Sequence, residues 1–97
     1  MLAWLRTLPC EPCRLSGMTQ FNPTEVEHWV TKARGGHDLG DTFPTCGYHR
    51  TVRHVCGAKT FQKNYPQRNW SDAGAEFAAR FLKNHPSVRI TADWERQ

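Results

Sequence analysis

The sequence predicts a small α+β domain that is stabilised by a zinc ion. Its 97 residues, 38% of them hydrophobic, make one domain whose hydrophobic core is marginal by itself. Cysteine and histidine occur in two pairs, Cys10-x2-Cys13 and Cys46-x2-His49, which can each present two ligands to one tetrahedral zinc ion. Strand-forming residues between the pairs and a helix-forming stretch after the second pair complete the α+β pattern. A structural zinc can contribute on the order of 10 kcal/mol to the folding of small modules.

The cysteines allow two other arrangements. Four cysteines in a small secreted chain commonly form two disulfides. The spacing instead pairs Cys10 with Cys13 and Cys46 with His49 and leaves Cys56 over, which favours zinc. If this pairing is misread, Cys56 replaces His49 as the fourth ligand.

Charge and hydropathy indicate a soluble, mildly basic protein. The net charge is +4 at pH 7 and the mean hydropathy is −0.71. A basic surface permits a polyanionic partner but does not require one. The chain has no run of 18 apolar residues, and residues 1–9 lack the basic leader and the cleavage site of a signal peptide. We therefore expect a cytoplasmic protein that does not span a membrane.

Helices and strands are predicted from periodicity and from turn residues. Gly57 is a natural stop for the helix that follows Cys46, and Ser71 is a natural N-cap for the last helix. No element is assigned to the basic and aromatic residues 58–70. The expected elements are a helical turn over 1–8, a knuckle over 10–13, a loop over 14–23, strands over 24–30 and 42–45, helices over 47–56 and 71–85, and a short strand over 87–92.

The predicted strand over 24–30 carries the residues of chemical interest. Alternation places Glu27 and His28 on opposite sides of this strand. The two side chains can therefore serve one centre only where the strand end is twisted or frayed. Trp29 follows directly, and a tryptophan in this place belongs to the core more often than to a surface that stacks on nucleotides.

The combination of these residues resembles the HNH endonucleases. The shared pattern is Cys-x2-Cys, an acidic residue or histidine before a histidine, a glycine-containing loop, and then Pro44-Thr45-Cys46-x2-His49-Arg50-x3-His54-x2-Gly57-x3-Phe61. More closely, it is similar to the phage recombination enhancement function family. These are RecA-dependent nucleases in which Leu-Pro-Cys-x2-Cys precedes His-His and Pro-Leu-Cys-x2-His-His. Leu8-Pro9-Cys10 and Pro44-Thr45-Cys46 match the two cysteine-bearing parts of that pattern.

The resemblance implies a ββα-metal fold, or His-Me finger, over about residues 8–61. The whole chain, residues 1–97, would form a single domain with an added C-terminal helix over about 71–85. The resemblance also implies roles by position. His28 takes the place of the general base, and Glu27 and His54 take the places of ligands to a catalytic divalent cation. Arg50 stands where the family has a further histidine or asparagine ligand.

Phosphodiester hydrolysis makes chemical sense of these residue types. It needs a water that is deprotonated near neutral pH, which suits the imidazole of His28. It also needs a cation beside the phosphate oxygens on which charge accumulates. A carboxylate such as Glu27 suits Mg²⁺ or Mn²⁺, and an imidazole from His54 favours Mn²⁺ or a later transition metal over Mg²⁺ alone.

Arg50 leaves two interpretations open. An arginine keeps its proton in proteins and cannot bind a metal ion. In the first interpretation Glu27, His54 and water hold the cation while Arg50 contacts the scissile phosphate and acts in catalysis. In the second, Arg50 pairs with Glu27 in place of a metal, and the site binds nucleic acid without cutting it.

The sequence thus predicts a metal-dependent DNA endonuclease of phage or prophage origin that acts in the cytoplasm of a bacterial host. Its expected partners are DNA and a RecA-type recombinase filament. One alternative is a zinc module that binds DNA or a recombination protein without cutting, and another is a purely protein-binding module. The candidate phosphate contacts are Lys32, Arg34, Arg53, Lys59 and Lys63.

Overall fold

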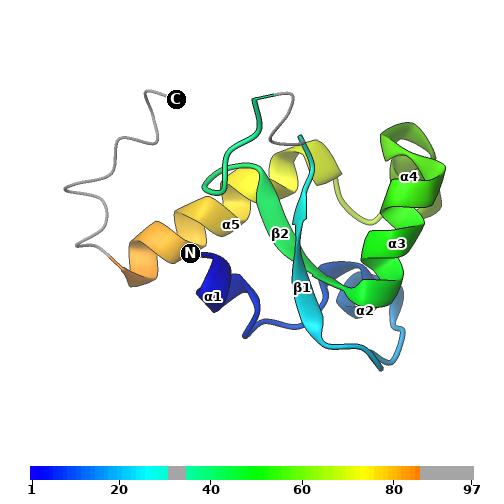
Figure 1. Ribbon diagram of the computed structural model, residues 1–97, viewed down its shortest axis with the longest axis horizontal. Coiled ribbons are helices and arrows are strands. Elements are labelled where there is room, and N and C mark those ends of the chain that lie inside the picture. The colour runs from blue at the N-terminus through cyan, green and yellow to red at the C-terminus, as the bar shows by residue number, and fades with distance from the viewer. Residues whose placement is uncertain (31–34, 86–97) are drawn as a thin grey trace.

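A computed structural model of the chain describes residues 1–30 and 35–85 (Figure 1). The elements in these residues are α1 (Leu2–Leu5), α2 (Glu11–Ser16), β1 (Thr24–His28), β2 (Thr42–Cys46), α3 (Gly47–Cys56), α4 (Ala58–Asn64) and α5 (Trp70–Asn84). This arrangement confirms the predicted α+β class. The expected strand over 87–92 lies outside the described residues. None of the helices described here has the length and apolar character needed to cross a bilayer.

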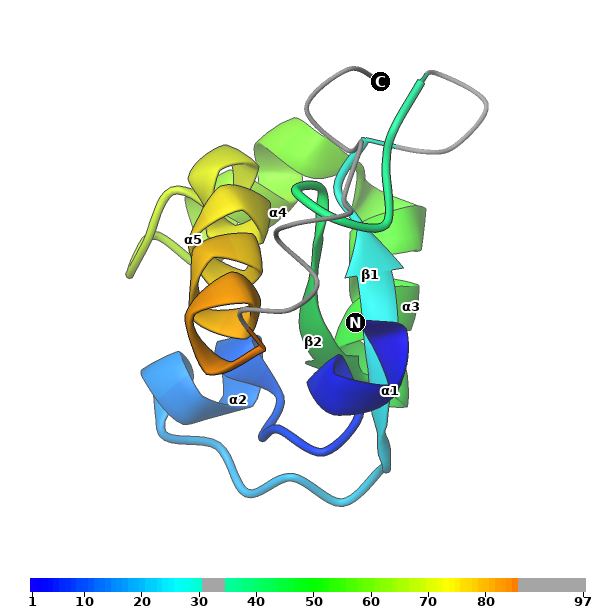
Figure 2. The same ribbon diagram turned by 90° about the vertical axis from the view of Figure 1, so that its left-hand side faces the viewer.

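β1 and β2 form an antiparallel two-stranded sheet between two helices. The register pairs Thr24 with Cys46 and His28 with Thr42. Helix α5 lies on one side of the sheet and α3 on the other (Figure 2). In the described part of the chain each strand has one edge without a partner strand, so Pro44 is accommodated in β2 despite its missing N–H. β2 runs directly into α3, which connects the sheet to the second cysteine and histidine pair.

Aromatic side chains from three elements meet in the core. Phe43 of β2, Phe61 of α4 and Trp70 of α5 are fully buried. Their ring centroids lie 5.0 Å apart for Phe43 and Trp70 and 5.5 Å apart for Phe61 and Trp70. The indole N–H of Trp70 donates a hydrogen bond of 2.7 Å to the carbonyl of Tyr65, which satisfies its polar group. This shared core fixes α4 and α5 relative to the sheet.

The predicted loop over 14–23 is wrong in its first part, because Glu11–Ser16 form helix α2. Cys10 occupies the N-cap, and Pro12 lies in the first turn, where its missing N–H has no hydrogen bond to lose. Gly17, with a φ of 71°, ends the helix in the left-handed conformation. Cys10 and Cys13 are therefore held by the first turn of a helix instead of a free knuckle.

Other elements also differ from the prediction. Helix α4 forms where no element was expected, because Phe61 is buried in the core and Tyr65 stacks on it at 4.6 Å. The strand expected over 24–30 ends at His28. The N-cap of α5 is Asn69, whose side chain accepts the N–H of Ser71.

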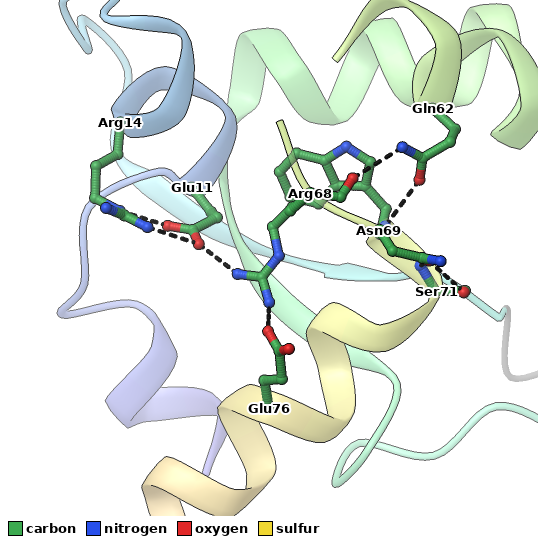
Figure 3. Close-up of polar contacts among 8 residues, drawn as sticks. Glu11, Arg14, Gln62, Arg68, Asn69, Ser71 and Glu76 are labelled. Atoms are coloured by element: carbon green, nitrogen blue, oxygen red, sulfur yellow. Dashed lines mark hydrogen bonds and ion pairs between the residues drawn. The ribbon is translucent and has the colours of Figure 1, made fainter. Parts of the chain in front are cut away.

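An ionic cluster joins α2 to α5 (Figure 3). Arg14 donates hydrogen bonds of 2.6 and 3.0 Å to the two carboxylate oxygens of buried Glu11. Arg68, which precedes α5, also bonds Glu11 and forms an ion pair with Glu76. Burial raises the pKa of Glu11, but the hydrogen bonds from Arg14 and Arg68 outweigh this effect and lower the pKa overall. An ionised Glu11 thus fastens the helix that carries Cys13 to the segment that begins α5.

Candidate metal centre and catalytic site

Cys10, Cys13, Cys46 and His49 come together at the starts of α2 and α3. Nδ1 of His49 lies 3.6 Å from Sγ of Cys10 and 3.3 Å from Sγ of both Cys13 and Cys46. The sulfur atoms of Cys13 and Cys46 are 3.8 Å apart. All four side chains are buried, and their ligand atoms lie within 4.8 Å of one another.

These distances fit a tetrahedral zinc ion. Zinc–sulfur bonds of about 2.3 Å at tetrahedral angles place two sulfur atoms about 3.8 Å apart, and the shorter zinc–nitrogen bond brings a nitrogen slightly closer. The cluster is therefore compatible with a structural zinc site formed by three cysteines and one histidine. Four protein ligands would leave no open position on the ion, which is the arrangement of a structural site.

The protonation state of the cluster depends on whether a metal ion is bound. Burial raises the pKa of the Cys10 and Cys13 thiols, which favours their neutral forms when no cation is bound. Burial lowers the pKa of His49, which keeps the imidazole in the neutral form that binds metals. Cysteines bind zinc as thiolates, so zinc uptake is coupled to proton release.

The alternative cysteine arrangements are wrong. All four cysteines are free thiols, and the Cys13–Cys46 sulfur distance is far longer than a disulfide bond of about 2.05 Å. Cys56 lies at the end of α3, outside the cluster, and its thiol contacts the carbonyl of Gly57. His49 is therefore the fourth member of the cluster.

Glu27 forms a second candidate centre on the side of β1 that faces α3. Its side chain is buried, with 1% of the residue surface exposed, and Oε1 lies 3.2 Å from Nε2 of His54. Its Oε2 has no hydrogen-bond partner among residues 1–30 and 35–85. Burial raises the pKa of Glu27, and the opposing effects of His54, Arg53 and Arg50 are smaller. The structure thus brings together the two predicted ligands of a catalytic cation.

His28 contacts the loop before β2. Its Nε2 lies 2.8 Å from Oδ1 of Asp38. The hydroxyl of Thr42 donates to the carbonyl of Asp38, and the N–H of Trp29 donates to the carbonyl of Asp41 at 2.8 Å. These bonds close the loop onto the end of β1. The imidazole of His28 therefore has a carboxylate partner at the point where the strand stops.

Arg50 forms an ion pair with Glu25. Nη1 of Arg50 lies 3.3 Å from Oε1 of Glu25, and both side chains are close to half exposed. The guanidinium thus bonds the carboxylate two positions before Glu27 on β1, and its charge acts on Glu27 less strongly than burial does.

The candidate phosphate contacts fall into three groups. Arg53 lies over the ring of Trp29 at 4.6 Å, and its Nη2 donates to the Trp29 carbonyl at 3.0 Å. Lys59 and Lys63 are exposed on α4. Lys32 and Arg34 lie outside the described residues.

Neither a scan against protein-family models nor searches of curated proteins and of solved structures found a match to this chain. The structure supports a small α+β protein with a two-stranded antiparallel sheet and a buried cluster that can hold a metal ion.

The sequence analysis did not identify Asp38, which contacts His28, or Gly74, which contacts the loop that carries Asp38. Antiparallel pairing of the two predicted strands could have indicated Asp38. In that pairing the residues just before Thr42 lie close to the end of β1 and therefore to His28. Gly74 lies in the middle of α5, and a Cβ there would collide with the backbone of Gly40 and Asp41. A glycine inside a helix suggests a close contact, but the sequence does not show with which segment.

Proposed function

We propose that the protein is a zinc-stabilised, metal-dependent endonuclease of the HNH type. The observation that carries this proposal is the carboxylate of Glu27, buried beside His54 with one oxygen that accepts no hydrogen bond from the described residues. Burying a carboxylate without full compensation is costly, so such groups are usually paired or bound to a cation. A divalent cation held by Glu27 and His54 would complete this pairing.

The donor set suits the chemistry of phosphodiester hydrolysis. Glu27 offers an oxygen of the kind that Mg²⁺ and Mn²⁺ prefer, and the imidazole of His54 adds a nitrogen that favours Mn²⁺. A cation in this place supplies stabilisation of the charge that develops on the phosphate oxygens. Half of the His54 side chain is exposed, so a substrate phosphate can approach from solvent.

His28 is the proposed general base, and Asp38 orients it. An Nε2–H donated to Asp38 holds the imidazole in one orientation and leaves Nδ1 with a lone pair. That nitrogen can then take a proton from the attacking water. His28 is the last residue of β1 and is still paired with Thr42, so the proposal requires the ring of His28 and the carboxylate of Glu27 to flank one phosphate from adjacent positions of a paired strand.

Arg50 is proposed to bind the scissile phosphate. Its guanidinium is exposed, pairs with Glu25 through one long contact of 3.3 Å, and can exchange that carboxylate for a phosphate. An exposed ion pair of this kind contributes little to stability, so exchanging its partner costs little.

The residue pattern also bears on the origin of the protein and on its partners. The resemblance to the phage recombination enhancement function family supports a phage or prophage protein that cuts DNA in the cytoplasm of a bacterial host. It also supports a RecA-type filament as a partner.

The test is cleavage of supercoiled plasmid and of single-stranded DNA by zinc-loaded protein with Mg²⁺ or Mn²⁺. We expect cutting that needs the added cation and is lost in Glu27→Gln. Glu25→Gln is the matched control, because Glu25 lies on the same strand and is half exposed, and it should keep its activity. Cutting that survives Glu27→Gln, or no cutting with either cation even on DNA that carries a RecA-type filament, would overturn the proposal.

A second candidate function is DNA binding without cleavage. Arg50 favours it, because an arginine occupies a position where a metal ligand is expected and cannot replace one. This function predicts salt-sensitive DNA binding that Glu27→Gln leaves unchanged, with no product in the cleavage assay.

A further inference from the structure

A pocket of about 410 Å³ lies where the end of β1 meets α4 and the start of α5. These three elements lie close together in Figure 1. Its volume is in the lower part of the range typical of small-molecule sites. The residues that line it are Trp29, Ala58, Lys59, Gln62, Asn69 and Ser71.

The pocket is a neighbour of the candidate catalytic centre. Trp29 follows His28 and lies two positions after Glu27, a separation of about 7 Å along an extended chain. Arg53 acts on both the pocket and the candidate catalytic centre. Its guanidinium covers the indole of Trp29 at 4.6 Å. Its charge also acts on Glu27, lowering a pKa that burial raises more strongly.

The lining combines the part of the Trp29 ring that Arg53, Phe43 and Phe61 leave uncovered with hydrogen-bond donors and a positive charge. Lys59 is exposed, and the side-chain oxygen of Asn69 accepts from the N–H and the hydroxyl of Ser71, so the side-chain nitrogen of Asn69 is the group left to donate to a ligand. Gln62 is fully engaged by the carbonyl of Arg68 and the N–H of Trp70, which fixes one wall of the pocket. No carboxylate lines the pocket, so it suits a flat ligand that carries carbonyl groups and is attached to a negatively charged group such as a phosphate.

We propose that this pocket receives an unstacked nucleobase from the strand whose neighbouring phosphate lies at the Glu27–His54 centre. This inference rests on the proposed nuclease function and names its substrate class as single-stranded or locally unpaired nucleic acid. A base inside a duplex is stacked and paired and must leave the helix before it can enter such a pocket. Bases of a single strand are free to contact the side chains of a pocket, including the uncovered part of an aromatic ring, while cations hold the backbone.

The test is an NMR titration of zinc-loaded protein, without added divalent cation, with a short oligothymidylate and with a duplex of the same length. We expect the single strand to shift the indole N–H signal of Trp29 and the side-chain amide signals of Asn69, and the duplex to shift them little. Lys59→Ala should weaken single-strand binding roughly fivefold, the loss of about one good contact. Lys83→Ala, an exposed lysine in the last turn of α5 and outside the pocket lining, should change it less.

Because no cutting takes place in this titration, its result is separate from that of the cleavage assay. Indole shifts without DNA cleavage would support the pocket assignment and contradict the proposed nuclease function. Cleavage without indole shifts, equal shifts with the duplex, or equal losses in Lys59→Ala and Lys83→Ala would overturn the pocket assignment.

Discussion

Removal of zinc from the purified protein with a chelator is expected to unfold it. The Cys3His cluster joins the first turn of α2 to the first turn of α3, and both turns depend on it for their position. A structural zinc in a small module contributes on the order of 10 kcal/mol, which is comparable to the whole stability of a domain of this size. Circular dichroism should show loss of helical signal on chelation and recovery when zinc is returned.

Matched cysteine variants control this result. Cys46→Ser should lose zinc and unfold, whereas Cys56→Ser should keep one zinc per chain, because Cys56 lies outside the cluster. Acidification should also release the metal, since the ligands bind it as thiolates and neutral imidazole. A chelated protein with an unchanged spectrum and melting temperature would show that the cluster does not hold the fold together.

His28→Ala is expected to lower the rate of DNA cleavage by about 10²- to 10⁴-fold, the usual contribution of a positioned general base. The loss should appear in kcat and leave KM nearly unchanged, because His28 acts on the water and not on substrate binding. Single-turnover cleavage of a labelled oligonucleotide measures both. His85→Ala is the control, since this histidine caps the far end of α5.

Asp38→Asn separates orientation from catalysis. If Asp38 positions the ring of His28, this variant should cut more slowly than the wild type and faster than His28→Ala, with KM unchanged. NMR should show the Nε2–H form of His28 in the wild type and a mixture of both neutral forms in the variant. An unchanged tautomer of His28 would contradict the orienting role of Asp38. A His28→Ala variant that cuts at the wild-type rate would contradict the role of His28 as general base.

The local sequence was sufficient to predict the features that depend on the spacing of residues along the chain. Gly57 marked the end of α3, and β-branched residues marked both strands. The spacing of the four ligands was sufficient to predict the metal cluster. Each pair of ligands is separated by two residues, and one ion can join the two pairs. Glu27 and His54 were found through the family pattern, and the structure places them 3.2 Å apart.

Features that depend on contacts between distant segments could not be predicted. Glu11 and Arg68 are separated by 57 positions, and a single sequence contains no information on which buried carboxylate meets which arginine. Helix α4 was missed for the same reason, since its stability comes from Phe61 packing on Trp70 and not from a regular apolar stripe. The partner of Arg50 proved to be Glu25, a residue to which the sequence analysis assigned no role.

Binding of Mn²⁺ to zinc-loaded protein, followed by electron paramagnetic resonance, tests the central claim most directly. Glu27→Gln is the matched variant. It should remain folded and melt no lower than the wild type, because burial raises the pKa of Glu27 and ionising the buried carboxylate costs stability as the pH rises from the ordinary pKa to the raised one. The account predicts one bound Mn²⁺ per wild-type chain and none in Glu27→Gln. A wild-type protein that binds no Mn²⁺, or a variant that binds it equally well, would contradict a catalytic cation at Glu27 and His54.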